Sequence, residues 1–175
     1  MIAIISEKPS VGLDIARVVG ADTRNDGYCS GNGYMVTWAL GHLVSLAMPD
    51  TYGYTKTASE DLPMLPDPFR LVSRQVRTDR GMVTDIAASK QLKIIENVFN
   101  RSDSIIVATD AGREGELIFR WIYDFLGCTK PFRRLWISSL TDEAIRKGLE
   151  ELKDGSEYNS LYAAADSRAK ADWLV

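Results

Sequence analysis

The chain has 175 residues, of which 45% are hydrophobic and 26% charged, a composition typical of one globular domain that excludes a disordered chain. Its net charge of -3 excludes a globally basic surface, so any nucleic acid would be held by local basic patches or through a metal ion. The two cysteines, Cys29 and Cys128, form no zinc-binding or disulfide pattern, which fits a reducing, cytoplasmic location. Residues 1–5 are apolar but too few to cross a membrane, and we expect no membrane partner.

The chain begins with a strand pattern followed by a helix pattern. Residues 2–5 have the apolar character of a buried strand, and Pro9 suits the first turn of a helix. The helix is indicated by apolar residues at helical spacing, namely Val11, Ile15, Val18 and Val19. Glu7 and Lys8 therefore lie at a strand-to-helix corner, where they are either an ordinary solvated pair or contacts for a metal ion and an anion.

A hairpin and a single histidine come next. Residues 28–30 and 34–40 have strand character and are joined by Gly31-Asn32-Gly33, a typical hairpin turn. His42, the only histidine, follows at the end of the second strand. From its position alone it is either a structural residue or a side chain that reaches a ligand crevice.

Residues 49–68 are rich in proline and polar residues, which predicts a long surface connection. A locally basic run follows, made up of Arg70, Arg74, Arg77 and Arg80. Apolar residues interleave with it, so a solvated strand or loop face is favoured over a phosphate-contacting edge. Residues 85–100 then have the pattern of an amphipathic helix, with an expected buried stripe of Ile86, Leu92, Ile95 and Phe99.

The stretch with most chemistry lies near residue 110. A buried-type strand beginning at Ile105 ends before Asp110, and helical periodicity starts at Glu114. Three carboxylates within seven residues, those of Asp110, Glu114 and Glu116, suggest a hard divalent cation such as magnesium. The alternative is an acidic helix start paired with Arg113. If this strand lies beside residues 2–5 in a parallel sheet, the carboxylates of Glu7, Asp110 and Glu114 converge.

The last third of the chain continues the alternation of strand and helix. Gly127 suits a helix stop, residues 132–137 have strand character, and Thr141 suits a helix cap. Ser138 and Ser139, in the turn between them, have hydroxyls that serve either as caps or as donors to an anion. Residues 158–175 have a helical stripe, through Leu161, Ala165, Ala169 and Trp173, without a stop signal, so we expect a piece of a longer protein. The alternation predicts a mainly parallel sheet covered by helices.

Three motifs, in this order, resemble the Toprim domain of type IA DNA topoisomerases, most closely bacterial topoisomerase III. They are Ser6-Glu7-Lys8-Pro9-Ser10, the strand of residues 36–38 running into Gly41-His42-Leu43, and Asp110-Ala111-Gly112-Arg113-Glu114-Gly115-Glu116. Residues 134–141 and 168–175 also look like family segments. The resemblance implies an α/β, Rossmann-like Toprim fold over residues 1–155, with a mainly parallel sheet flanked by helices. Residues 156–175 would begin a following helical, DNA-binding domain.

The same resemblance implies roles for individual residues. Magnesium would be held by Glu7, Asp110 and Glu114; Glu7, Lys8 and Arg113 would be catalytic; and Lys8, His42, Arg113 and Arg168 would contact DNA, with Lys8 on the scissile phosphate. Two positions depart from the family pattern. Gly112 replaces the second aspartate of an Asp-x-Asp motif, which leaves one metal ligand fewer, and Thr57 stands where many relatives place an aromatic residue that could stack on a base.

By resemblance, the full enzyme would cleave, pass and religate single DNA strands through a 5′-phosphotyrosine, and so relax or decatenate DNA. It would act in the bacterial cytoplasm at the nucleoid, with single-stranded DNA, a helicase and a single-strand-binding protein as partners. The family's nucleophile lies in a Tyr-Pro-Arg-Thr type of motif, and none of the seven tyrosines has that context, so we expect this chain to be inactive alone. The alternatives are a Toprim nuclease or primase-type domain and a non-catalytic recombination module.

Overall fold

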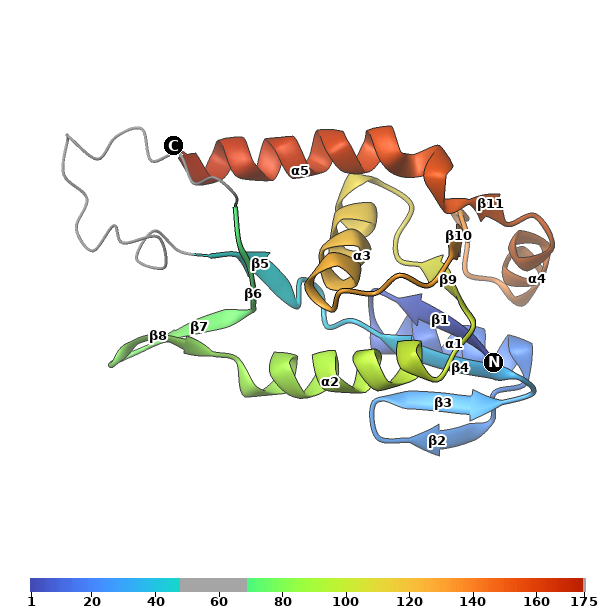
Figure 1. Ribbon diagram of the computed structural model, residues 1–175. Coiled ribbons are helices and arrows are strands. Elements are labelled where there is room, and N and C mark those ends of the chain that lie inside the picture. The colour runs from blue at the N-terminus through green and yellow to red at the C-terminus, as the bar shows by residue number, and fades with distance from the viewer. Residues whose placement is uncertain (48–68, 175) are drawn as a thin grey trace.

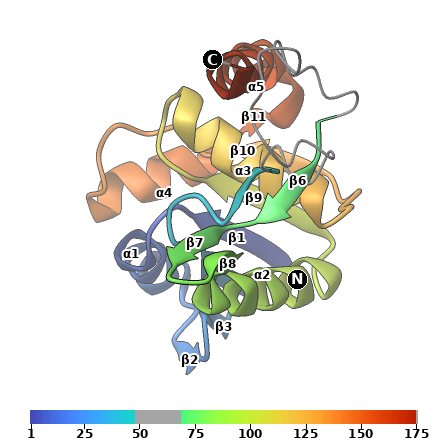
Figure 2. The same ribbon diagram turned by 90° about the vertical axis from the view of Figure 1, so that its left-hand side faces the viewer.

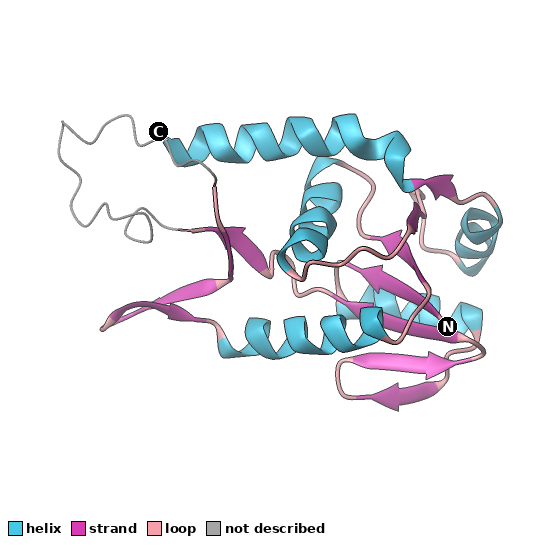
Figure 3. Cartoon of the chain, in the orientation of Figure 1, coloured by secondary structure: helices cyan, strands magenta, loops and turns pink. Residues whose placement is uncertain are grey.

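The structure is a computed structural model that describes residues 1–47 and 69–174 (Figure 1). The expected connection at residues 49–68, including Thr57, lies outside the described residues. A seven-stranded sheet forms the centre of the molecule, with helices on both of its faces (Figure 3). This is the α/β architecture that the alternating pattern predicts.

The strand order in the central sheet is β11-β10-β9-β1-β4-β3-β2. The strands are β1 Ile2–Ser6, β2 Thr23–Asn25, β3 Tyr28–Gly31, β4 Tyr34–Trp38, β9 Ser104–Ala108, β10 Phe132–Arg134 and β11 Lys153–Asp154. The four central strands β10, β9, β1 and β4 are parallel, whereas the strands at both edges pair antiparallel. Two small antiparallel sheets, formed by β5 Val44–Leu46 with β6 Leu71–Ser73 and by β7 Gln75–Thr78 with β8 Gly81–Thr84, lie outside it.

The helices are α1 Pro9–Val19, α2 Ile86–Asn100, α3 Arg113–Phe125, α4 Asp142–Glu150 and α5 Asn159–Leu174, with a 3-10 helix, Gly155–Tyr158, before the last. One core lies between the sheet and α1 with α4, and the other between the sheet and α2 with α3. Strand β1 contributes to both cores. Ile4 faces the core with α1 and α4, and Ala3 and Ile5 face the core with α2 and α3. A strand buried on both faces is apolar throughout, which is why the sequence signal was strong.

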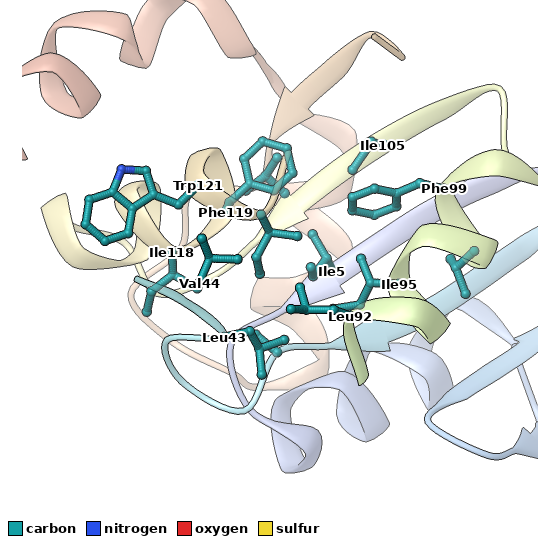
Figure 4. Close-up of a cluster of buried hydrophobic side chains, with 14 of the residues drawn as sticks. Ile5, Leu43, Val44, Leu92, Ile95, Phe99, Ile105, Ile118, Phe119 and Trp121 are labelled. Carbon is teal, nitrogen blue, oxygen red and sulfur yellow. The ribbon is translucent and has the colours of Figure 1, made fainter. Parts of the chain in front are cut away.

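The core on the α2 and α3 side is the larger one (Figure 4). Leu92 and Ile95 of α2 and Ile118 and Phe119 of α3 belong to this core, on the same face of the sheet. Helix α5 packs on the outer side of α3, where Ala165 joins the same core (Figure 2). No helix among the described residues is both long and apolar enough to pass through a membrane.

Most of the predicted local signals are confirmed. Pro9 occupies the first turn of α1, Gly127 ends α3 with a φ of 63°, and the Asp85 carboxylate caps α2 by accepting from the N–H groups of Ala87 and Ala88. The predicted hairpin is present as β3 and β4.

Two predictions about element faces and lengths were wrong. Ile86 is 83% exposed, because it is the first residue of α2 and that turn extends beyond the end of the sheet (Figure 1). The three later stripe residues are buried as predicted. Strand β10 stops at Arg134 instead of continuing to residue 137, since its parallel partner β9 ends at Ala108.

Candidate functional site

The carboxyl ends of β1, β4, β9 and β10 meet at one edge of the sheet because these strands are parallel. Backbone hydrogen bonds join the loops that leave this edge. The Ala39 N–H donates to the Ser6 carbonyl at 2.9 Å, and the Gly41 N–H donates to the Glu7 carbonyl at 3.4 Å. The segment after β4, which carries His42, is therefore tied to the corner that carries Glu7 and Lys8.

Glu7 and Asp110 lie side by side at this edge, although 103 residues separate them in sequence. The Asp110 N–H donates to Glu7 Oε1 at 3.4 Å. Burial raises the pKa of the Glu7 carboxyl above its usual range, and the negative charge of Asp110 raises it further, against the opposing effects of the Asp110 N–H and of Lys8. The predicted convergence of these two residues is confirmed, and the site favours a cation that would offset their repulsion.

Glu114 takes a different partner. Its Oε2 lies 2.8 Å from His42 Nε2. The centroids of the His42 and Trp121 rings are 6.1 Å apart. Across the described residues, no three acidic, histidine or cysteine side chains gather closely enough to hold a metal ion. The expected set of three carboxylates is thus present as a Glu7–Asp110 pair and a Glu114–His42 pair. The first turn of α3, which carries Glu114, faces the loop after β4.

Glu116, the third carboxylate of the acidic stretch, is a structural residue. Its side chain is buried and forms ion pairs with Arg120 at 2.8 Å and with Arg134 at 3.1 Å. An acidic helix start paired with arginine was the alternative interpretation of this stretch, and it is confirmed for Glu116. The partners, however, are these two arginines and not Arg113.

Arg134 holds the acidic loop and was missed as an individual residue by the sequence analysis. It is 1% exposed, and its guanidinium donates to the carbonyls of Val107 at 3.0 Å and Asp110 at 2.8 Å. Burial lowers the pKa of Arg134, whereas the charge of Glu116 acts in the opposite direction. The available signal was an arginine inside a strand pattern together with a glutamate on the buried face of α3.

Gly115 allows α3 to begin directly against the acidic loop. A Cβ atom at this position would lie 1.9 Å from the Asp110 carbonyl oxygen, and the Thr109 hydroxyl donates to the Gly115 carbonyl at 2.7 Å. Gly112 differs, because a Cβ atom there would meet nothing within 4 Å. The two glycines of the motif thus have separate roles, since only Gly115 is required by packing.

A pocket of about 610 Å³ opens beside the Glu114–His42 pair. It is lined by His42, Arg113, Glu114, Leu117, Trp121, Ala165, Arg168, Ala169 and Asp172. Three of the four residues predicted to contact DNA, all except Lys8, therefore share one pocket. Lys8 lies exposed at the N-terminus of α1, at the acidic edge.

The basic run after residue 69 is divided between two environments. Arg74 is structural, because it pairs with Asp85 at 2.9 Å and donates to the carbonyls of Leu40 and His42 at 2.7 and 3.1 Å. Arg77 and Arg80 are exposed on the β7–β8 hairpin, as expected for a solvated strand face. Arg74 therefore supports the loop that carries His42.

A mainly parallel sheet with acidic residues at its carboxyl edge is the arrangement expected of a Toprim domain. The model of the Toprim domain family matches residues 2–140, and the chain belongs to this family. Toprim domains are generally metal-binding.

Among curated relatives, the chain is 49% identical over 177 residues to DNA topoisomerase 3 of Shouchella clausii, covering 99% of this chain and 23% of that protein. It is 46% identical over 176 residues to DNA topoisomerase 3 of Bacillus subtilis, with 98% and 23% covered. The chain thus spans 23% of the length of these relatives. Among solved structures, full-length topoisomerase I from Thermotoga maritima shares the fold, with a TM-score of 0.52, 18% identity and coverage of 87% of this chain and 21% of that one.

Proposed function

We propose that this chain is the N-terminal part of a type IA DNA topoisomerase that cleaves, passes and religates single DNA strands through a 5′-phosphotyrosine, with Mg²⁺ as the metal. Membership of the Toprim family and the curated relatives named DNA topoisomerase 3 support the class. In this proposal residues 1–155 are the metal-binding catalytic domain, and residues 156–175 begin the next domain. Single-stranded DNA is the substrate, a helicase and a single-strand-binding protein are partners, and the enzyme works in the cytoplasm at the nucleoid.

One observation carries the proposal, namely the Glu7–Asp110 pair on adjacent parallel strands. Mg²⁺ is commonly bound by one or two carboxylates together with substrate phosphates, and these two side chains offer that set of oxygen donors. Glu114, the third ligand that the resemblance implies, lies in the first turn of α3, where its carboxylate pairs with His42, so in this structure the Glu7–Asp110 pair alone supports the proposed centre. Bound Mg²⁺ would neutralise phosphate charge at this edge.

The chain's own residues would hold the DNA around this pair. The Lys8 ammonium is exposed at the α1 N-terminus, where a phosphate is also favoured by the helix dipole. Arg113 is exposed at the start of α3 and forms no ion pair with any described residue, so it is available for a second phosphate oxygen. Glu7 would serve the reaction as a metal ligand, because its carboxylate lies beside that of Asp110.

Mg²⁺ titration by calorimetry, with the Asp110→Asn variant beside the wild type, tests the centre. Asparagine keeps the shape of the side chain and removes its charge, so we expect Mg²⁺ binding to be lost. Asp79→Asn is the matched control, because Asp79 is exposed in the β7–β8 turn and has no ion-pair partner among the described residues. Equal Mg²⁺ affinity in Asp110→Asn and the wild type would refute the proposed site.

The purified chain is expected not to cleave single-stranded DNA in the presence of Mg²⁺, because no tyrosine here lies in a Tyr-Pro-Arg-Thr type of motif. The assay is electrophoresis of an end-labelled oligonucleotide, with detection of both free and protein-linked products. Cleavage that is lost in Asp110→Asn would assign the chain to a self-contained Toprim nuclease instead. DNA binding that neither Mg²⁺ nor Asp110→Asn alters would indicate a non-catalytic module.

A further inference from the structure

Two hollows adjoin on the side of the acidic edge that faces β10. The first, of about 340 Å³, extends from Thr109 and Asp110 to the segment after β10. The second, of about 390 Å³, extends from that segment to α4 and Tyr158. Ile137 and Ser138 line both hollows, so the two adjoin, and we treat them together as one groove. We call it the β10–α4 groove.

The chemistry of the β10–α4 groove changes along its length. The part next to Asp110 has apolar walls, formed by Val11, Ile15, Leu135, Ile137 and Leu140. The far part contains Lys147 and Lys153, which are both exposed and form no ion pair with any described residue. Glu151 is the acidic residue in that part. The groove therefore leads from a carboxylate site over an apolar surface to two available cations.

An aromatic pair lies beside these lysines. Trp136 is 41% exposed and stacks on Tyr158, with ring centroids 5.0 Å apart and an angle of 22° between the planes. The guanidinium of Arg134 also lies over the indole, 5.1 Å from its ring centroid. Tyr158 and Arg134 hold the indole in place, and the part of its surface that stays exposed lines the groove. Exposed indole surface next to lysines is the combination that binds single-stranded nucleic acid, through bases and phosphates respectively.

The two serines of this segment differ in their hydrogen bonds. Thr141 caps α4, because its hydroxyl oxygen accepts from the Ala144 N–H at 3.2 Å. The Ser139 hydroxyl oxygen accepts from the Thr141 N–H at 3.5 Å, at the start of the same helix. Ser138 is exposed and forms no side-chain hydrogen bond with a described residue, so its hydroxyl can donate to an anion in the groove.

We propose that the β10–α4 groove binds single-stranded DNA next to the Glu7–Asp110 pair, where bound Mg²⁺ would hold one phosphate. Sugars and bases contact the apolar walls and Trp136, and Lys147 and Lys153 contact phosphates two or more nucleotides away from the acidic pair. Two adjoining open hollows with two separate cations fit a polymer better than a small anion. This inference rests on the proposed function, because single-stranded DNA is the substrate in that proposal.

The test compares the salt dependence of oligothymidylate binding, by fluorescence anisotropy, in the wild-type chain and in Lys147→Ala/Lys153→Ala. Losing two phosphate contacts is expected to lower the slope of log K against log salt by about 1.4. The matched control is Lys90→Ala/Lys93→Ala on α2, which removes the same charge from the opposite face of the sheet. Circular dichroism verifies that each variant is folded.

The result expected is a lower slope and weaker binding in the groove variant alone, with a larger effect for an oligonucleotide of about 16 nucleotides than for one of about 4. Equal slopes in the groove and control variants would overturn the proposed binding of DNA in the groove, whether or not Asp110→Asn binds Mg²⁺. A groove effect together with normal Mg²⁺ binding by Asp110→Asn would overturn the proposed metal site and leave the groove. A wild-type chain that does not bind the oligonucleotide would overturn both.

Discussion

Gly115→Ala is the substitution whose cost the structure specifies best. The new methyl group would lie 1.9, 2.8 and 3.0 Å from the carbonyl oxygen, carbonyl carbon and nitrogen of Asp110. These are backbone atoms, and the Arg134 guanidinium donates to the same carbonyl oxygen at 2.8 Å. Either the acidic loop or the first turn of α3 must therefore move.

Overpacking of this kind costs up to about 3 kcal/mol. Weakening the Arg134 hydrogen bond adds roughly 1 kcal/mol. The better helix propensity of alanine offsets about 1 kcal/mol. The net loss of about 3 kcal/mol corresponds to a fall in Tm of roughly 6–12 °C for a chain of this size. Because the displaced residue is Asp110, Mg²⁺ affinity at a temperature where the variant is folded is expected to fall as well.

Thermal unfolding followed by circular dichroism measures this effect, with Gly112→Ala as the control from the same loop. A Cβ atom at Gly112 meets nothing within 4 Å, so that variant is expected to lose less than about 1 kcal/mol, mainly at the helix cap. If Gly115→Ala melts no lower than Gly112→Ala, the close approach of α3 to the acidic loop is not what stabilises this site.

Three further expectations concern the same edge. Gly112→Asp restores the second aspartate of the motif, at a position where a Cβ atom meets nothing within 4 Å. A carboxylate roughly 4 Å from a divalent ion in water-like surroundings should strengthen Mg²⁺ binding by about 2 kcal/mol, or ~30-fold, as measured by calorimetry. An unchanged Mg²⁺ affinity would mean that the ion binds elsewhere. Glu116→Gln leaves Arg134 buried without its charge partner and should lower the free energy of unfolding, measured in urea, by about 3–5 kcal/mol. Glu114 is exposed, so Glu114→Gln should lower it by less than about 1 kcal/mol. Similar losses in the two variants would contradict a stabilising role of the buried ion pair. The pKa of Glu7 is raised on folding, so its contribution to stability is present below the ordinary value of 4.5 and is lost as the pH rises through the folded pKa. Glu7→Gln should remove the loss of stability that sets in as the pH rises above 4.5. Urea unfolding at a series of pH values measures this, and parallel profiles for the variant and the wild type would show that Glu7 does not titrate in this way.

The predictions that were wrong share a cause. Periodicity assigned Ile86 to the buried face of α2, but it does not tell how far the sheet below the helix extends. Strand character up to residue 137 did not tell where the partner of β10 ends. In both cases the sequence pattern described a single helix or strand, whereas the burial of the helix residue and the length of the strand depended on the neighbouring sheet.

The sequence by itself determined the features that depend on a few consecutive residues. The turn between β3 and β4 follows from Asn32 and Gly33, which adopt φ values of 53° and 83°, and α4 begins where Thr141 caps it. The α/β class follows in the same way, because strands buried on both faces and amphipathic helices each have a distinct hydrophobic period.

The tertiary structure alone decided which charged groups meet. Glu7 meets Asp110 because β1 pairs with β9, and Glu116 is buried because Arg134 reaches it from β10. Glu114 turns to His42 instead of joining the acidic pair. Contacts between residues distant in sequence depend on strand order and helix packing across the whole domain, and the free energy of a charge depends on the partners and the burial that this packing provides.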